Sequence, residues 1–460
     1  MKLSKSFIGL IIVSLVFYLY ATNSFSIFQS NSALEIVDFS IESSSNKIDI
    51  PSNPFRNPYY GDLHVHTKYS FDAYIFGVTA TPYDAYKFAT GRAIKHPLGF
   101  DMKLREPLDF YAVTDHGFYM GMIENYADTS SKMSKNEWTI PMHNLNRPEN
   151  VTVESTGERA DLFSSVVRQA IVIPHPWWHP NYIGAWLTNN IQLALKSFDY
   201  DVHKSAWADV ANAAEEFNDP GKFTTFIGYE FTTSTDVEGG NLHRNVIFNS
   251  SNAPIRPWTR IDSINPEDLW TWMDNLRDKG VDSLAMPHNS NGSNGQMFEV
   301  ETFRGNPINE EYAEKRMRNE PVVEMTQVKG TSDTHPLLSP DDEWADFEIM
   351  DKRVGSRPPT YSMPQGGYVR DAYLRGLTLD WEGRGNPYKF GLIGSSDTHT
   401  GAGAYDENNY WSKVGVLDGT DMGRGSVPLS QDRIDQLTQY SIDFNLSLIH
   451  ISEPTRRQQI

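Results

Sequence analysis

The stretch Gly61-Asp62-Leu63-His64-Val65-His66-Thr67-Lys68-Tyr69-Ser70-Phe71-Asp72 decides the fold and the chemistry expected of this chain. Residues 63–67 have the character of a short strand, and alternate residues of a strand point to the same face. We therefore expect His64 and His66 to project together, as two imidazole ligands of one metal ion do. A turn after the strand can return Asp72 toward them.

The composition is that of a folded, strongly acidic protein. The 460 residues suffice for one large α/β domain with insertions or for two domains, and 39% of them are hydrophobic. A formal net charge of -19 makes nucleic acid a poor partner. Because the chain has no cysteine, disulfides and thiolate metal sites are excluded. Any metal must be bound by His, Asp and Glu, which suits zinc, manganese, iron or magnesium.

The N-terminal part is expected to lie outside the folded domain. Lys2 and Lys5 precede an apolar run from Phe7 to Tyr20, which predicts a signal peptide over residues 1–26. An uncleaved membrane anchor is the alternative, although the run is shorter than the roughly 20 residues of a membrane span. Residues 27–56 are polar and predict a flexible lead-in. We therefore expect a periplasmic or secreted protein.

The other end of the chain is also set apart. Residues 446–460 begin with Leu446-Ser447-Leu448-Ile449-His450-Ile451-Ser452-Glu453-Pro454, which resembles a translated sequencing adapter. We therefore expect the domain to cover residues 57–445 and to lack part of its natural C-terminal portion.

Further metal-type ligands recur where apolar, strand-like runs end. In barrels and α/β sheets such positions meet at the carboxyl edge of the strands. The candidates of this kind are His116, His288, Asp397 and His399, whereas His243 lies near the start of a strand-like run. Glu230 differs, because it interrupts an apolar run, and a carboxylate there needs a cation or another partner. Asp115 can bind metal or orient a histidine as an outer partner.

A Ser-Asp-Thr-His motif occurs twice. The second copy follows an apolar strand and precedes Gly401, so Asp397 and His399 are preferred as ligands. Asp333 and His335, from the first copy, are assigned to the rim of a pocket or to structure.

Caps and turn residues predict the helices. Helices are expected over residues 81–90 and 204–217, and a third after Asn265 that closes at Gly280. Residues 119–170 have weak periodicity and are expected to form an insertion, and residues 322–328 a strand.

Five motifs together resemble the PHP superfamily (polymerase and histidinol phosphatase) over about residues 57–410. They are Gly61–Thr67, Thr114–Gly117, Gly228–Glu230, Pro287–Asn289 and Gly394–His399. The similarity is closest to a large exported branch classed as a domain of unknown function. It implies a distorted (β/α)7 barrel with large insertions and a metal site at the carboxyl end of the strands. The metal ligands that it implies are His64, His66, Asp72, His116, Glu230, His243, His288, Asp397 and His399.

The expected function is metal-dependent hydrolysis of a small, anionic ester, with phosphate esters favoured. Two or three divalent ions (zinc, manganese or iron) would lower the pKa of a bridging water from about 15.7 toward roughly 7, giving hydroxide near neutral pH. The expected catalytic residues are Asp115, His288 and His399, with either histidine protonating the leaving group. The expected substrate-binding residues are Arg244, Lys329, His335 and Arg370.

Three alternatives remain. The same site suits a sulfate ester. An amidohydrolase-type barrel also starts with His-x-His, but that class usually adds a bridging lysine where this chain offers Glu230. A metal-binding domain without catalytic activity belongs to another class, and the largely complete ligand set argues against it.

Overall fold

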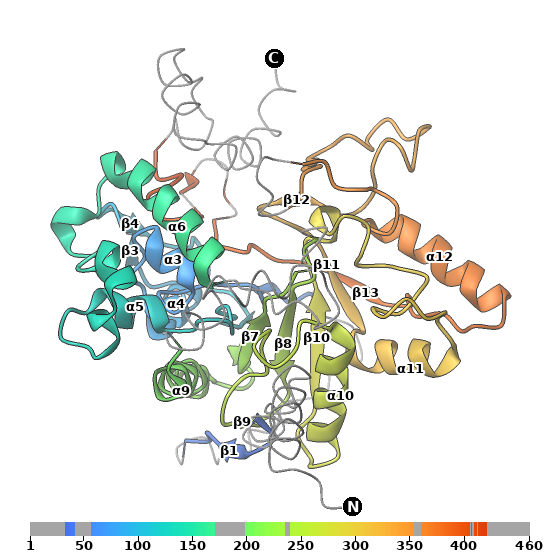
Figure 1. Ribbon diagram of the computed structural model, residues 1–460, viewed down its shortest axis with the longest axis horizontal. Coiled ribbons are helices and arrows are strands. Elements are labelled where there is room, and N and C mark those ends of the chain that lie inside the picture. The colour runs from blue at the N-terminus through green and yellow to red at the C-terminus, as the bar shows by residue number, and fades with distance from the viewer. Residues whose placement is uncertain are drawn as a thin grey trace, which may run out of the picture.

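Short strands and helices alternate along the computed structural model. It describes residues 33–41, 57–170, 198–234, 240–353, 360–404, 406, 409–411 and 413–420. The predicted signal peptide and adapter-like tail lie outside these residues. Figure 1 shows β7, β8, β10 and β11 near the middle, with α3 to α6 on one side and α11 and α12 on the other. The fold is mixed α/β, as predicted.

The strands of the described residues form five small sheets, of which none is closed. One sheet is parallel and joins β2 (Gly61–Asp62), β5 (Phe110–Tyr111) and β6 (Thr224–Thr225). A second is antiparallel and joins β7 (Gly228–Phe231), β8 (Arg244–Phe248) and β10 (Ser283–Pro287). A third joins β11 (Val322–Gln327), antiparallel β12 (Gly330–Thr331) and parallel β13 (Gly391–Gly394). The two-stranded sheets pair β1 (Ile36–Asp38) with β9 (Asn252–Pro254) and β3 (Ile94–Lys95) with β4 (Asp101–Met102).

These sheets do not form the closed parallel barrel that the resemblance implies. Adjacent strands run antiparallel from β7 through β8 to β10, whereas a (β/α)7 barrel is built from parallel strands. Single-residue β-bridges nevertheless connect chain segments that follow strands of different sheets. Val65 pairs with Thr398 and His116 pairs with Glu230, both in parallel. The stretch around His64 therefore lies between the chain after β5 and the chain after β13.

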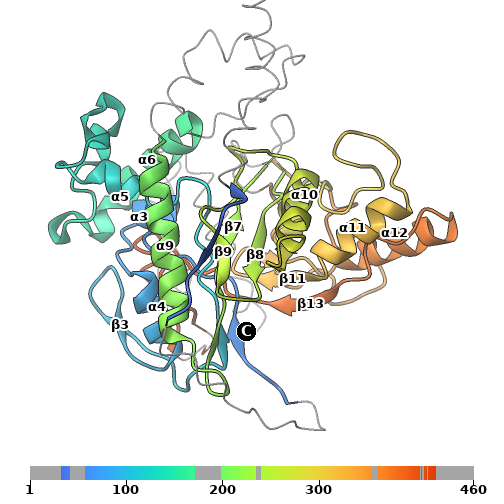
Figure 2. The ribbon, with the colours of Figure 1, turned by 90° about the horizontal axis from the view of Figure 1, so that it is seen from below.

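Helices cover the sheets from both sides. The α-helices are α3 (Phe71–Ile75), α4 (Pro82–Ala89), α5 (Met122–Ala127), α6 (Thr156–Ala170), α9 (Tyr200–Phe217), α10 (Pro266–Arg277), α11 (Glu310–Asn319) and α12 (Val369–Trp381). The 3₁₀ helices are η2 (Met133–Lys135), η3 (Glu137–Met142), η4 (Pro148–Asn150), η5 (Val153–Ser155) and η6 (Ser290–Gly292). Figure 2 shows α9 alongside α4, and the two helices are in contact.

The predicted helix signals are confirmed. Thr81 caps α4 through a reciprocal pair of hydrogen bonds with Asp84, and Pro82 occupies its first turn. Asn265 caps α10 by accepting from the backbone N–H of Glu267. Residues 119–170 contain α5, α6 and the 3₁₀ helices between them, and their apolar side chains form a core cluster of their own with α3.

Part of the predicted lead-in belongs to the fold. Residues 33–41 lie within residues 27–56, and their strand β1 pairs with β9 while Ala33 and Phe39 are buried. The flexible lead-in expected there is therefore wrong for these residues. The prediction used the average polarity of residues 27–56 and so overlooked a short apolar stretch within them. The strand that pairs with this stretch lies more than 200 residues away in the sequence.

None of the helices in the described residues is long and apolar enough to cross a membrane.

Gly61, which starts the deciding stretch, is required by close packing. A Cβ there would overlap the ring and the carbonyl oxygen of Phe110 on the neighbouring strand β5. We expect Gly61→Ala to destabilise the protein by about 1–3 kcal/mol, the range for overpacking, as measured by urea unfolding. Gly157→Ala is the control, because a Cβ there meets nothing within 4 Å. Equal unfolding midpoints for the two variants would contradict the packing argument.

Candidate metal centre

Two imidazole nitrogens and two carboxylate oxygens converge at the centre of the fold. The Nε2 atoms of His64 and His66 are 3.1 Å apart. Asp397 Oδ1 lies 3.2 Å from each Nε2 atom, and Glu230 Oε2 lies 3.4 and 3.3 Å from them. All four residues are buried. The predicted strand over residues 63–67 is not formed, since β2 ends at Asp62 and Val65 makes only an isolated bridge, but the two rings nevertheless lie side by side as expected.

Backbone pairing explains why these groups meet. The N–H of His66 donates to the carbonyl of Thr398 at 2.8 Å, and the N–H of Thr114 donates to the carbonyl of Val65, also at 2.8 Å. Farther along, the N–H of Glu230 donates to the carbonyl of Asp115 at 3.0 Å. Four distant parts of the chain are thus held side by side where their ligand-type residues occur.

The hydrogen bonds around His66 determine its tautomer. Ser70 Oγ donates its proton to Asp115 Oδ1 at 2.7 Å. It can then only accept from His66 Nδ1, which lies 2.8 Å away. His66 therefore carries its proton on Nδ1 and presents a lone pair at Nε2. Burial, aided by His399 and His116, lowers the pKa of His66 to about 3, so the ring is neutral.

His64 is held in a similar way by a carboxylate. Its Nδ1 lies 2.9 and 3.2 Å from the two carboxylate oxygens of Glu324, which is buried. A proton on Nδ1 leaves Nε2 free to bind an ion, the arrangement of many metal-ligating histidines. Burial opposes a charge here, but Asp397 and Glu324 outweigh it and raise the pKa of His64. The surroundings therefore favour a cation at this place.

Two further groups adjoin the first. Asp72 Oδ2 lies 3.2 Å from His116 Nε2 and 2.9 Å from His399 Nε2. Glu230 Oε1 lies 3.1 Å from His116 Nδ1 and 2.5 Å from His243 Nδ1. Burial opposes a charge on His116, but Glu230 and Asp72 outweigh it and raise its pKa to about 10.

Several buried atoms of the cluster have lone pairs or protons without a hydrogen-bond partner. Both ring nitrogens of His288 and Oδ1 of Asp397 are of this kind. Buried polar atoms normally have a hydrogen-bond partner, so these atoms indicate that the cluster binds something further, such as a metal ion. Four sets of three buried or half-buried side chains have ligand atoms close enough to hold a metal ion: His66, His116, His399; His64, His66, Asp397; His64, His288, Glu324; and His116, Glu230, His243. The donor set fits divalent metals, and the kind of metal stays open.

Comparison with known proteins identifies the family. Residues 53–447 match the family described as "Protein of unknown function (DUF3604)". The chain belongs to this family. No curated protein and no solved structure matches it.

The cluster of this DUF3604 chain unites the nine predicted ligands. Each contacts at least one other, and they come from six separate parts of the sequence. His243 and Asp72 are the most exposed of the nine, with side chains 18% and 17% exposed. Both lie at the edge of the cluster.

Asp115 stands behind the cluster. Its two oxygens accept from the backbone N–H and the hydroxyl of Thr67, both at 2.6 Å, and from Ser70. Of the two roles considered for Asp115, the geometry favours orienting a histidine over binding metal.

The four predicted substrate-binding residues are scattered. The ammonium of Lys329 pairs with Asp397, whose Oδ2 also accepts from Gln327 at 2.6 Å. Arg244 is buried and its guanidinium pairs with Glu320 at 2.7 Å. Arg370 pairs with Asp333 and Asp342, and His335 lies beside Tyr368. Only Lys329 reaches the cluster.

Sequence reasoning missed Glu324 as a member of the cluster. The signal was present, because Glu324 interrupts the apolar run of β11 as Glu230 interrupts that of β7. The same argument from a buried carboxylate selects both residues.

The role of Ser70 can be tested directly. In Ser70→Ala, His66 loses the acceptor that keeps its proton on Nδ1, so we expect metal affinity to fall about 10–100-fold in a chelator competition titration. Ser164→Ala is the control, since it removes another buried hydroxyl, which donates to the carbonyl of Ala160 in α6. Unchanged affinity in a folded Ser70→Ala variant would refute the tautomer argument.

Proposed function

We propose that this protein is a metal-dependent hydrolase that cleaves small anionic esters, and that its substrates are phosphate monoesters or diesters. The observation that carries the proposal is the convergence of His64 Nε2, His66 Nε2, Glu230 Oε2 and Asp397 Oδ1 in one buried place. Such a set of lone pairs without a cation is unfavourable in a low-dielectric interior.

The residues divide into groups that would hold two or three ions. His64, His66, Glu230 and Asp397 surround the first position, and Asp72, His116 and His399 surround a second. His243 forms a further set with His116 and Glu230, and His288 forms one with His64 and Glu324. When bound, divalent ions supply an activated water and neutralise ester oxygens.

The protein's own groups would manage protons and orientation. His399 and His288 lie inside the cluster, and whichever of them is not bound to an ion would donate a proton to the leaving oxygen. The ammonium of Lys329 stands at Asp397 and can bind an oxygen of the substrate. Asp115, through Ser70, would keep His66 in its ligating tautomer.

We also propose that the chain is a divergent member of the PHP superfamily. The order of neighbours supports it: the sheets follow one another through the bridges Val65–Thr398 and His116–Glu230 and through contacts of β10 with β11. This order is the one expected of a distorted barrel with the ligands at one end. Its proposed location is the periplasm or the outside of the cell, which rests on the apolar N-terminal run.

Removing the first pair of ligands tests the metal site. We expect the double variant His64→Ala/His66→Ala to contain no bound metal. Its rate of ester hydrolysis should fall by about 10³-fold or more, because the water is activated only when metal ions bind it. Metal analysis of the purified protein and steady-state turnover are the measurements. His143→Ala is the control, since this histidine lies outside the cluster and its Nε2 hydrogen-bonds to the carbonyl oxygen of Ser134. Full turnover in the double variant would exclude the mechanism.

The substrate class is tested with the wild-type protein. After removal of metal by a chelator, zinc, manganese or iron is added back and the turnover of phosphate monoesters, phosphate diesters and sulfate esters is compared. We expect activity on phosphate esters that disappears with the chelator and returns with metal. Activity on sulfate esters alone would replace the phosphoesterase assignment, and metal binding without any turnover would favour a binding domain.

A further inference from the structure

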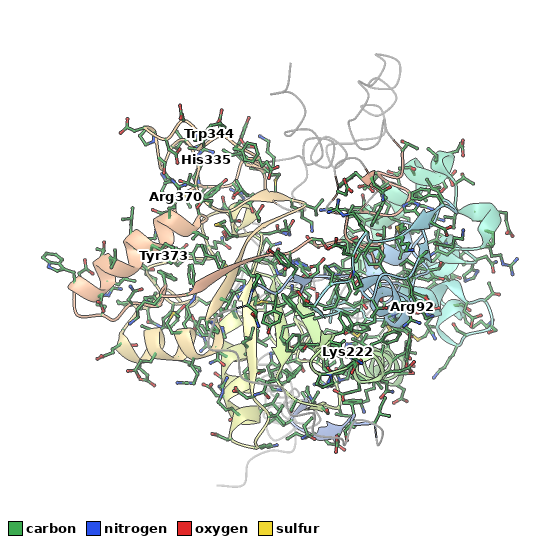
Figure 3. All side chains as sticks on the ribbon, turned by 180° about the vertical axis from the view of Figure 1, so that it is seen from behind. Arg92, Lys222, His335, Trp344, Arg370 and Tyr373 are labelled. Carbon is green, nitrogen blue, oxygen red and sulfur yellow. The ribbon has the colours of Figure 1, made fainter. Side chains whose placement is uncertain are left out.

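A cavity is lined by residues of β12, of the start of α12 and of the chain around Trp344. It has a volume of about 340 Å³ and is lined by Thr331, Asp333, Thr334, Trp344, Phe347 and Arg370, among others. We call it the Trp344 pocket. Its volume is within the range of small-molecule sites, roughly 300–1,000 Å³. Figure 3 shows Trp344, Arg370 and His335 at one edge of the molecule, away from Arg92 and Lys222.

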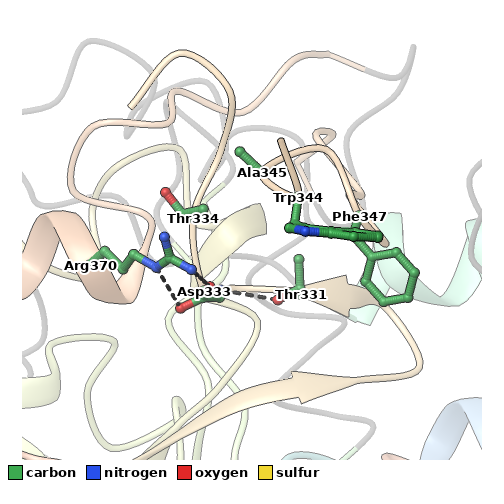
Figure 4. A pocket seen from close by; sticks show the side chains of 7 residues that line it. All are labelled: Thr331, Asp333, Thr334, Trp344, Ala345, Phe347 and Arg370. Carbon is green, nitrogen blue, oxygen red and sulfur yellow. Dashed lines mark hydrogen bonds and ion pairs between the residues drawn. The ribbon is translucent and has the colours of Figure 1, made fainter. Parts of the chain in front are cut away.

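One side of the pocket is aromatic. The Trp344 side chain is 66% exposed and that of Phe347 is 41% exposed. Figure 4 shows the two rings together on the side of the pocket opposite Arg370. Large rings left in water at the wall of a cavity provide faces against which an apolar or C–H-rich surface can pack.

The other side is polar but nearly neutral. The guanidinium of Arg370 donates to both oxygens of Asp333, from Nε at 3.2 Å and from Nη2 at 2.6 Å, and to Asp342 from Nη1 at 2.6 Å. Within the lining, the carboxylate of Asp333 balances the charge of Arg370, and Asp342, outside the lining, brings a second carboxylate to the same guanidinium. The hydroxyls of Thr331 and Thr334 add donors and acceptors.

The pocket is attached to the metal centre by a short piece of chain. β11 carries Glu324 and Gln327 to the cluster, and Lys329 follows with its ammonium at Asp397. Thr331 is two residues farther, so its Cα is within about 7 Å of that of Lys329. A substrate anchored at the metal ligands can therefore extend toward the pocket.

We propose that the Trp344 pocket binds a neutral sugar ring, and that the substrates of the metal centre are phosphate esters of sugars. Only the statement about phosphate esters rests on the proposed function, and binding of the sugar ring in the Trp344 pocket does not depend on it. The apolar C–H face of the ring packs on Trp344 and Phe347. Its hydroxyls bond to the Asp333–Arg370 pair and to Thr331 and Thr334.

The charges select this class among flat or ring-shaped ligands. A free anion is disfavoured because Arg370 is already shared by Asp333 and Asp342. A quaternary ammonium group prefers an aromatic cage without a guanidinium in its wall. A hydroxylated, uncharged ring uses both the aromatic side and the paired donors and acceptors of the polar side.

Binding is tested on the full-length, metal-loaded protein with ligands that carry no phosphate, so that the result does not depend on ester hydrolysis. The methyl glycosides of glucose, galactose and mannose are titrated and followed by saturation-transfer NMR. We expect at least one to bind, and Trp344→Ala to weaken it about tenfold, which corresponds to about 1.4 kcal/mol. Trp344→Phe, which keeps a ring, retains most of the affinity. Trp381→Ala is the matched control, because Trp381 is 89% exposed on α12 and does not line the pocket.

The kinetic arm uses the metal-loaded protein and compares hexose phosphates with glycerol phosphate, choline phosphate and nucleoside monophosphates. We expect Trp344→Ala to raise KM about tenfold for hexose phosphates alone, with kcat little changed. No loss of glycoside binding in Trp344→Ala, or a KM effect confined to choline phosphate or nucleotides, would overturn the sugar assignment. If no phosphate ester is hydrolysed, the proposed function fails, and glycoside binding that depends on Trp344 still supports the pocket.

Discussion

The rest of the structure depends on a buried cluster of imidazole nitrogens and carboxylate oxygens whose lone pairs point at one another. Such a cluster needs a compensating positive charge. His64 and His66 turn their Nε2 atoms toward each other, and Glu230 and Asp397 add carboxylate oxygens within 3.4 Å of them. In an interior that water does not reach, such groups repel unless a positive charge lies between them. A proton on His64 can meet this need in part, and bound metal ions would meet it for the whole cluster.

Much of the candidate site could be predicted because its chemistry is restrictive. In a chain without cysteine, metal must be bound by His, Asp and Glu, and those residues are conspicuous when they follow or interrupt apolar runs. His116, Glu230 and His288 were found in this way. The ends of α4 and α10 were equally visible, since caps such as Thr81 and Asn265 act through contacts within one turn of chain.

What could not be predicted depends on pairing between distant segments. Nothing local shows that β8 runs antiparallel between β7 and β10, or that β1 pairs with β9. The register of a strand follows from its neighbours, and these are chosen in three dimensions. Arg244 and Arg370 illustrate the same limit, because a cation's carboxylate partners decide whether it faces a substrate.

The metal centre also bears on why the chain closes on itself. Asp62 accepts from the backbone N–H of Ser396, 334 residues away, at 3.1 Å, and Val65 and Thr398 pair beside it. Closing so long a loop costs entropy that one hydrogen bond hardly offsets. An ion held by His64 and His66 on one segment and by Asp397 on the other would join the same two segments through stronger bonds. Metal binding and the closing of the fold would then be coupled, since the ligand set exists only when both segments meet.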